Sequence, residues 1–99
     1  MADEQTQMKA RWIRAEVKEV VWELIFELAS NPRAPRTPTA RLKEDLDYHS
    51  LGLLELAFTL EDEFDLEPID EEVAQSIQTV GDVVDHVLEQ LSSRGDLAA

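Results

Sequence analysis

Apolar residues recur with helical spacing in the first third of the chain, between about Lys9 and Ala29. At 100° per residue they gather on one side of a helix, while the glutamates fall mostly beside or opposite them. Trp22 and Phe26 lie off this apolar stripe. The spacing predicts an amphipathic helix whose core-facing residues are Ile13, Val17, Val20, Val21, Leu24 and Leu28.

Prolines at positions 32, 35 and 38 end this pattern, and we expect a long ordered loop from Ser30 to about His49. A second helix is predicted over residues 50–64, and a short third helix over residues 71–76 with Asp70 as its N-cap. A fourth helix, residues 79–91, opens on a near variant of the capping box. Its apolar stripe consists of Val80, Val83, Val84, Val87 and Leu91.

No segment shows the two-residue period of a β-strand, so the pattern predicts an all-α fold, most simply a small helical bundle. The 99 residues suffice for one domain with a single modest core. We expect a frayed N-terminus over residues 1–8, a helical core over residues 9–91 and a flexible tail over residues 92–99.

The predicted helix over residues 50–64 carries apolar residues on two faces. One stripe, formed by Leu53, Leu56, Ala57, Leu60 and Phe64, is wide enough to face a core. The opposite stripe would either be covered by the long loop or the short third helix, or serve as a docking surface of apolar anchors rimmed by charge. Its apolar members are Leu51, Leu54 and Phe58, and its rim consists of Glu55, Glu61 and Asp62.

The negative charge of the protein is concentrated in the second half of the chain. The net charge is −13, and residues 41–91 account for all of it, with two basic side chains against fifteen acidic ones. Such acidity disfavours nucleic acid as a partner and favours proteins with basic docking surfaces. No apolar run approaches the roughly 20 residues of a membrane span, and the start is polar rather than signal-like, so we expect a cytoplasmic protein without a membrane partner.

The sequence has few side chains that could take part in catalysis or bind a metal ion. The absence of cysteine excludes thiol nucleophiles and thiolate metal sites, and the two isolated histidines do not form a zinc site. His49 is the sequence neighbour of Ser50, which is poor geometry for a base and its nucleophile, and His86 is expected on a solvated face. The acidic residues 61–72 lack the glycine and glutamate of a calcium loop. We therefore predict neither a catalytic residue nor a metal site.

Ser50 stands where the second helix begins. From composition alone it is either an N-cap or a modified serine, because a helix N-terminus also favours an attached phosphate. The surrounding sequence narrows this choice. The runs Asp45-Leu46-Asp47-Tyr48-His49-Ser50-Leu51, Leu54-Glu55-Leu56, Leu60-Glu61-Asp62-Glu63-Phe64, Pro68-Ile69-Asp70-Glu71-Glu72 and Ile77-Gln78-Thr79-Val80 resemble acyl carrier proteins, without a gap from Leu42 to Leu91.

This resemblance implies a four-helix bundle with a long first loop and a short third helix. It implies a non-catalytic carrier whose Ser50 hydroxyl receives 4'-phosphopantetheine from coenzyme A through a phosphopantetheinyl transferase. It further implies a carrier that is a monomer when free and docks ketosynthase and other acyl-processing enzymes. The positions that correspond to the docking surface are His49, Leu51, Leu54, Glu55, Phe58, Glu61 and Asp62.

Three positions depart from the family pattern: Asp47 replaces a glycine, Pro68 and Ile69 are in reversed order, and His49 replaces an aspartate. His-Ser-Leu also resembles the motif of peptidyl carrier domains. We expect a carrier of thioester-linked acyl or polyketide intermediates in polyketide or other specialised biosynthesis. The alternatives are a free-standing peptidyl carrier, an unmodified carrier-like interaction module and a small acidic calcium-binding protein.

A last expectation concerns the cargo. The interior of the bundle is a hypothetical shelter for part of the acyl chain. The residues expected around it are Leu56, Leu60, Phe64, Ile69, Val73 and Ile77.

Overall fold

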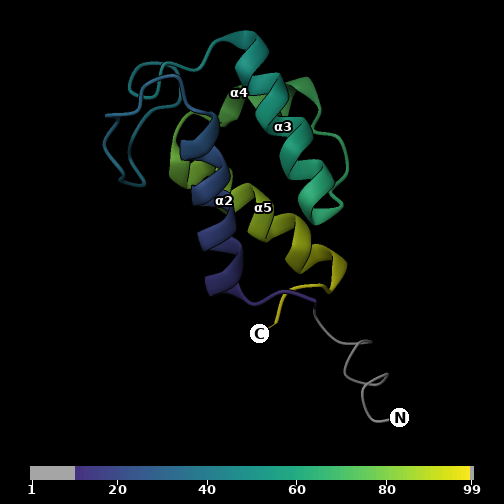
Figure 1. Cartoon of the computed structure of the whole chain (residues 1–99). Coiled ribbons are helices and arrows are strands. Elements are labelled where there is room, and N and C mark those ends of the chain that lie inside the picture. The colour runs from purple at the N-terminus through teal and green to yellow at the C-terminus, as the bar shows by residue number, and fades with distance from the viewer. Residues whose placement is uncertain (1–10, 99) are drawn as a thin grey trace.

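The computed structural model of the protein describes residues 11–98, which hold four α-helices and no β-strand (Figure 1). The helices are α2 (Arg14–Leu28), α3 (Ser50–Phe64), α4 (Glu71–Ser76) and α5 (Val80–Arg94). This confirms the all-α prediction, and α3 and α4 begin and end at the predicted residues. None of these helices is long and apolar enough to cross a membrane. The predicted frayed terminus, residues 1–8, lies outside the described part of the chain.

The N-caps show why α4 and α5 begin where they do. The Asp70 carboxylate accepts a hydrogen bond from the Val73 amide, and the Thr79 hydroxyl accepts one from the Asp82 amide. The Asp82 carboxylate in turn accepts from the Thr79 amide, which completes the capping box. Each of these bonds satisfies an amide that a helix N-terminus otherwise leaves without a partner. The signals are local, which explains why the sequence located both starts.

Both ends of the described chain differ from the prediction. Helix α5 runs three residues beyond Leu91, and the segment after it forms a parallel bridge between Leu97 and Trp12. The Trp12 amide donates to the Asp96 carbonyl at 2.9 Å, and the Ala98 amide donates to the Trp12 carbonyl at 2.8 Å. The backbone is therefore extended through Ile13, and α2 begins only at the next residue.

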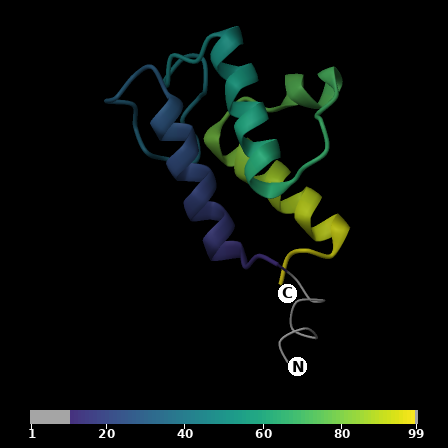
Figure 2. The same cartoon turned by 45° about the vertical axis from the view of Figure 1, so that its right-hand side comes forward.

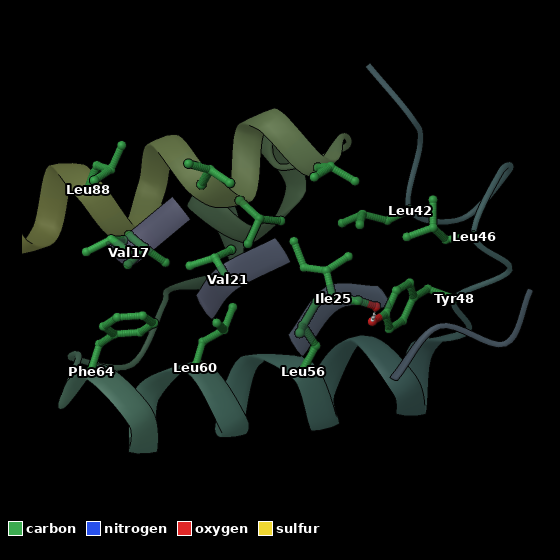
Figure 3. Packing of buried hydrophobic residues seen from close by; sticks show 14 of the residues in the cluster. Val17, Val21, Ile25, Leu42, Leu46, Tyr48, Leu56, Leu60, Phe64 and Leu88 are labelled. Atoms are coloured by element: carbon green, nitrogen blue, oxygen red, sulfur yellow. Dashed lines mark hydrogen bonds between the residues drawn. The ribbon is translucent and has the colours of Figure 1, made fainter. Parts of the chain in front are cut away.

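The core lies where α2 packs against α3 and α5 (Figures 1 and 2). Its α2 contribution is Val17, Val21 and Ile25, all without solvent exposure. The predicted stripe was therefore rotated: Ile25 was missed, and Ile13, which precedes the helix, is half exposed. Figure 3 shows how this row faces the α3 residues of the core, which are Leu56, Leu60 and Phe64.

The long loop between α2 and α3 is ordered, as predicted, because it is tied to the start of α5. The Leu42 amide donates to the Gln78 carbonyl at 2.9 Å, and the Val80 amide donates to the Ala40 carbonyl at 3.0 Å. Leu42 and Leu46 are buried in the core. The loop thus delivers the chain to the start of α3 along a fixed path.

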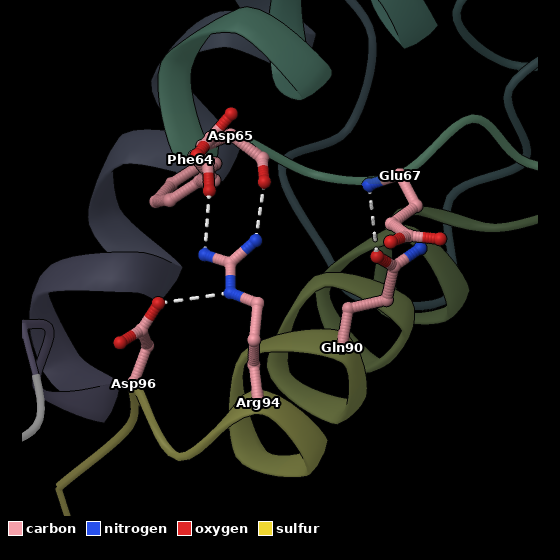
Figure 4. A network of polar contacts seen from close by, with 6 residues as sticks. All are labelled: Phe64, Asp65, Glu67, Gln90, Arg94 and Asp96. Carbon is pink, nitrogen blue, oxygen red and sulfur yellow. Dashed lines mark hydrogen bonds and ion pairs between the residues drawn. The ribbon is translucent and has the colours of Figure 1, made fainter.

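Arg94, in the last turn of α5, closes the opposite end of α3 (Figure 4). Its guanidinium donates to the carbonyl oxygens of Phe64 and Asp65 and pairs with the Asp96 carboxylate at 2.8 Å. The last carbonyls of a helix have no partner within the helix. Arg94 therefore supplies hydrogen-bond donors to the carbonyls at the C-terminus of α3. It also holds Asp96, in the segment that follows α5.

Candidate functional site

Ser50 is exposed and is the first helical residue of α3. The N-cap is His49, whose backbone is extended and whose side chain makes no capping hydrogen bond. The interpretation of Ser50 as an N-cap is therefore wrong. The serine hydroxyl lies at a helix end whose amides and dipole favour negative charge.

Tyr48, two residues before Ser50, anchors this end of the loop. Its ring is buried, and its hydroxyl donates to the Ile25 carbonyl (Figure 3). Burial, together with the nearby Glu55 carboxylate, raises the pKa of Tyr48, so the hydroxyl keeps its proton and remains a donor. A Cβ atom at Gly52 would lie 3.3 Å from the Tyr48 ring, so this glycine leaves room for the anchor.

One face of α3 presents large apolar side chains to solvent. The exposed fractions of Leu51, Leu54 and Phe58 are 78%, 50% and 59%. Neither the long loop nor α4 covers them, so that alternative is wrong. His49 and the rim residues Glu55 and Asp62 are exposed, and Glu61 is half-buried. The structure thus brings the predicted docking residues onto one continuous face that begins beside Ser50.

A cavity of about 140 Å³ lies between α3, α4 and α5. Two members of the expected shelter do not line it, because Phe64 packs against Trp12 in a tilted pair with 4.8 Å between ring centroids, and Val73 is partly exposed on α4. A second hollow, with Lys43, Gln75 and Gln78 in its wall, adjoins the cavity and shares Leu42, Leu53, Ala74 and Ile77 with it. The cavity is lined by Leu42, Leu53, Leu56, Ala57, Leu60, Glu61, Leu66, Ile69, Ala74, Ile77, Val83, His86 and Val87.

Comparison with known proteins decides the family. The family model of the phosphopantetheine attachment site matches residues 11–87. A Mycobacterium tuberculosis protein assigned as an acyl carrier protein has a similar structure, with a TM-score of 0.64 and 37% sequence identity over 74% of this chain and 96% of that one. The chain belongs to the acyl carrier protein family.

The acyl carrier protein from Enterococcus faecalis is also similar in structure, with a TM-score of 0.62 and 31% identity over 80% of this chain and 99% of that one. As a member of this family the protein is a non-catalytic carrier, and its prosthetic group is 4'-phosphopantetheine. It interacts with a phosphopantetheinyl transferase and with acyl-processing enzymes in general. An exposed serine hydroxyl at a helix N-terminus has the chemistry to form the phosphodiester of that group.

Asp47 explains how this acyl carrier protein tolerates the loss of the usual glycine before the motif. Its φ of 62° places it in the left-handed region, which glycine adopts freely and which aspartate enters more readily than most residues. The loop backbone therefore keeps a shape suited to glycine.

We expect Asp47→Gly to raise the free energy of unfolding by about 0.5–1 kcal/mol, because it relieves left-handed strain at an exposed position. Asp47→Ala should lower it, since alanine has neither glycine's freedom nor a polar side chain. Urea denaturation of the three proteins measures both changes. A less stable glycine variant would contradict the assignment of strain to this residue.

Other structural features of the site were not predicted. His86 was expected to be solvated, but it is half-buried in the cavity wall and bonded to Gln90. Tyr48 lies within the motif, yet nothing in the sequence indicates that it reaches Ile25, 23 residues earlier. The only sign of this anchor in the sequence was an aromatic residue two positions before Ser50. Among the described residues, no three His, Asp or Glu side chains gather to hold a metal ion.

Proposed function

We propose that Ser50 carries the 4'-phosphopantetheine arm and that the protein presents acyl or polyketide intermediates, held on that arm as thioesters, to partner enzymes. The observation that carries this proposal is the exposed Ser50 hydroxyl, which is not used as a cap and stands on a rigid helix end. When attached, the arm supplies the thiol that this cysteine-free chain lacks.

The chain's own residues support the arm in two ways. The N-terminal amides of α3 favour a phosphate bonded to Ser50. The anchored Tyr48 fixes the direction in which the arm leaves the protein, because the loop end cannot swing freely while its ring is buried. A partner enzyme therefore meets the arm in a defined position.

We assign partner docking to the exposed face of α3. Leu51, Leu54 and Phe58 are apolar anchors, and the carboxylates around them attract basic surfaces and repel acidic ones. The net charge of −13 over residues 41–91 extends this field to α4 and most of α5. We also propose that the apolar cavity receives the first part of the acyl chain.

His49 favours specialised over housekeeping biosynthesis in this proposal, because it replaces the aspartate of the usual motif with a side chain that carries no negative charge. The same residue supports a peptidyl carrier as the second candidate. Loading assays with acyl and aminoacyl donors distinguish the two: efficient aminoacyl transfer alone would favour the peptidyl function.

Intact mass spectrometry tests the attachment. After incubation with coenzyme A and a broad-specificity phosphopantetheinyl transferase, the protein should gain the mass of one phosphopantetheine, and tandem spectrometry should locate it on Ser50. An unchanged mass with several transferases, or an arm on another residue, would refute the proposal.

A further inference from the structure

The charge of the chain changes sign shortly before Ser50. Residues 30–43 contain four basic side chains and no acidic one, whereas residues 44–91 contain fifteen acidic side chains and no Lys or Arg. All four cations lie on the ordered loop between α2 and α3, and all are exposed; they are Arg33, Arg36, Arg41 and Lys43. This stretch of the loop is thus a basic segment in a chain whose net charge is −13.

Two of these cations have partners within the protein. The Arg41 guanidinium lies 3.9 Å from the Glu44 carboxylate, and the Arg41 amide donates to the Asp45 carboxylate at 2.8 Å. The Arg36 guanidinium lies over the Phe26 ring, 4.6 Å from its centroid. These contacts tie both arginines to the loop and to α2.

The other two cations, Arg33 and Lys43, form no ion pair with another residue in the described part of the chain. The backbone near Arg33 is held in place by Asn31, two residues earlier. The Asn31 amide donates to the Leu46 carbonyl at 3.2 Å. Arg33 therefore projects from a part of the loop that is fixed beside the stretch leading to Ser50.

Lys43 lies near the start of α3. The Leu42 carbonyl next to it accepts a hydrogen bond from the Tyr48 amide at 2.9 Å. Lys43 also shares a surface hollow with Leu53, three residues after Ser50 in α3. The loop and the start of α3 lie at the same end of the molecule (Figures 1 and 2). An enzyme that reaches the Ser50 hydroxyl therefore also approaches the loop.

We propose that Arg33 and Lys43 bind an acidic patch on the phosphopantetheinyl transferase that modifies Ser50. This deepens the proposed carrier function and rests on it. The transferase is the partner that we assign to the loop, because it must bring its active site to the serine hydroxyl itself. The transferase surface is then bipolar, with basic groups opposite the α3 carboxylates and acidic groups opposite the loop.

Two docking patches of opposite charge determine how the carrier is oriented. A uniformly basic surface attracts the acidic rim of α3 in any rotation of the carrier about Ser50, whereas like charges opposite the loop disfavour the wrong rotations. The loop is also fixed before binding by its hydrogen bonds to the start of α5. Docking therefore loses little backbone entropy.

The test measures the specificity constant for transfer of phosphopantetheine from coenzyme A to the full chain, with the phosphopantetheinyl transferase of the organism that makes this protein. Arg33→Glu and Lys43→Glu reverse one loop charge each, and Arg33→Lys and Lys43→Arg keep it. The matched control is Lys18→Glu, which makes the same change of charge at an exposed position of α2. Thermal melts verify that every variant folds.

The sign of the effect distinguishes local docking from overall attraction. For a partner that responds only to overall charge, a more acidic carrier binds a basic surface equally well or better. We expect Arg33→Glu and Lys43→Glu instead to lower the specificity constant about fivefold each at low salt, and Lys18→Glu to leave it unchanged or raise it. The charge-conserving variants should match the wild type. In about 1 M salt, where the Debye length is about 3 Å, the losses should largely disappear.

Unchanged or faster transfer to both loop variants, Arg33→Glu and Lys43→Glu, would overturn the proposal. An equal loss in Lys18→Glu would overturn it too, because the transferase would then respond to net charge and not to the loop. Intact mass separates these outcomes from a failure of the carrier function. A wild-type chain that gains one arm on Ser50 while the loop variants show no loss refutes only the docking by the loop. A wild-type chain that gains none refutes the attachment at Ser50, and the docking with it.

Discussion

Ser50→Ala should gain no phosphopantetheine under conditions that convert the wild-type protein completely. The substitution removes only the hydroxyl, which is the group to which we assign the phosphodiester. It should not disturb the fold, because His49 rather than Ser50 is the N-cap of α3, and alanine is a better helix former than serine by a few tenths of a kcal/mol. Mass and melting temperature together therefore separate loss of chemistry from loss of structure.

Ser92→Ala is the matched control, because Ser92 is an exposed helical serine on α5. This variant should gain one arm at the wild-type rate. Modification of the Ser50→Ala protein would contradict the assignment. A large loss of its stability would instead contradict the conclusion that Ser50 has no structural role as a cap.

The second large effect concerns the stability of the fold. We compare the replacement of phenylalanine by alanine at two positions of α3, one buried and one exposed. Phe64 is 1% exposed and packs against the tilted ring of Trp12, whereas Phe58 is 59% exposed on the outer face. Phe64→Ala should lower the free energy of unfolding by about 3–5 kcal/mol, because it opens a cavity in the core. Small domains have only about 5–15 kcal/mol of stability in total. The change should therefore be plain in urea denaturation.

Phe58→Ala should behave in the opposite way. Its effect on unfolding should be within about 0.5 kcal/mol, because it removes exposed surface. Its effect on docking should reach about 2 kcal/mol, which is typical of an aromatic anchor. The specificity constant of the phosphopantetheinyl transferase for each variant measures docking. Equal docking by Phe58→Ala and wild-type protein would remove Phe58 from the proposed surface.

The sequence predicted those parts of the fold that depend on nearby residues. The start of α4 follows from the Asp70 cap, and the start of α5 follows from the Thr79–Asp82 capping box. The start of α2 could not be predicted in this way, because Trp12 is held extended by Leu97, far along the chain. The burial of Ile25 likewise depends on how α2 is rotated against its neighbours.

In the candidate site, too, the features that depend on nearby residues were predicted, and those that depend on distant contacts were not. The motif indicated Ser50, and the two apolar faces of α3 indicated the docking residues, but only the packed structure shows that Leu51 and Phe58 remain uncovered. The anchor from Tyr48 to Ile25 joins residues far apart in sequence. Gln90 accepts a hydrogen bond from the Glu67 amide, 23 residues earlier in the chain. Local periodicity contains none of these contacts.

The bridge between Trp12 and Leu97 has a practical consequence for handling the protein. It holds the two ends of the described chain side by side, at the opposite pole of the bundle from the start of α3 (Figures 1 and 2). A fluorophore or immobilising tag placed after Ala98 would therefore sit far from Ser50. Molecules tethered to a sensor chip in this way would present the start of α3 away from the chip, toward any enzyme flowing over them.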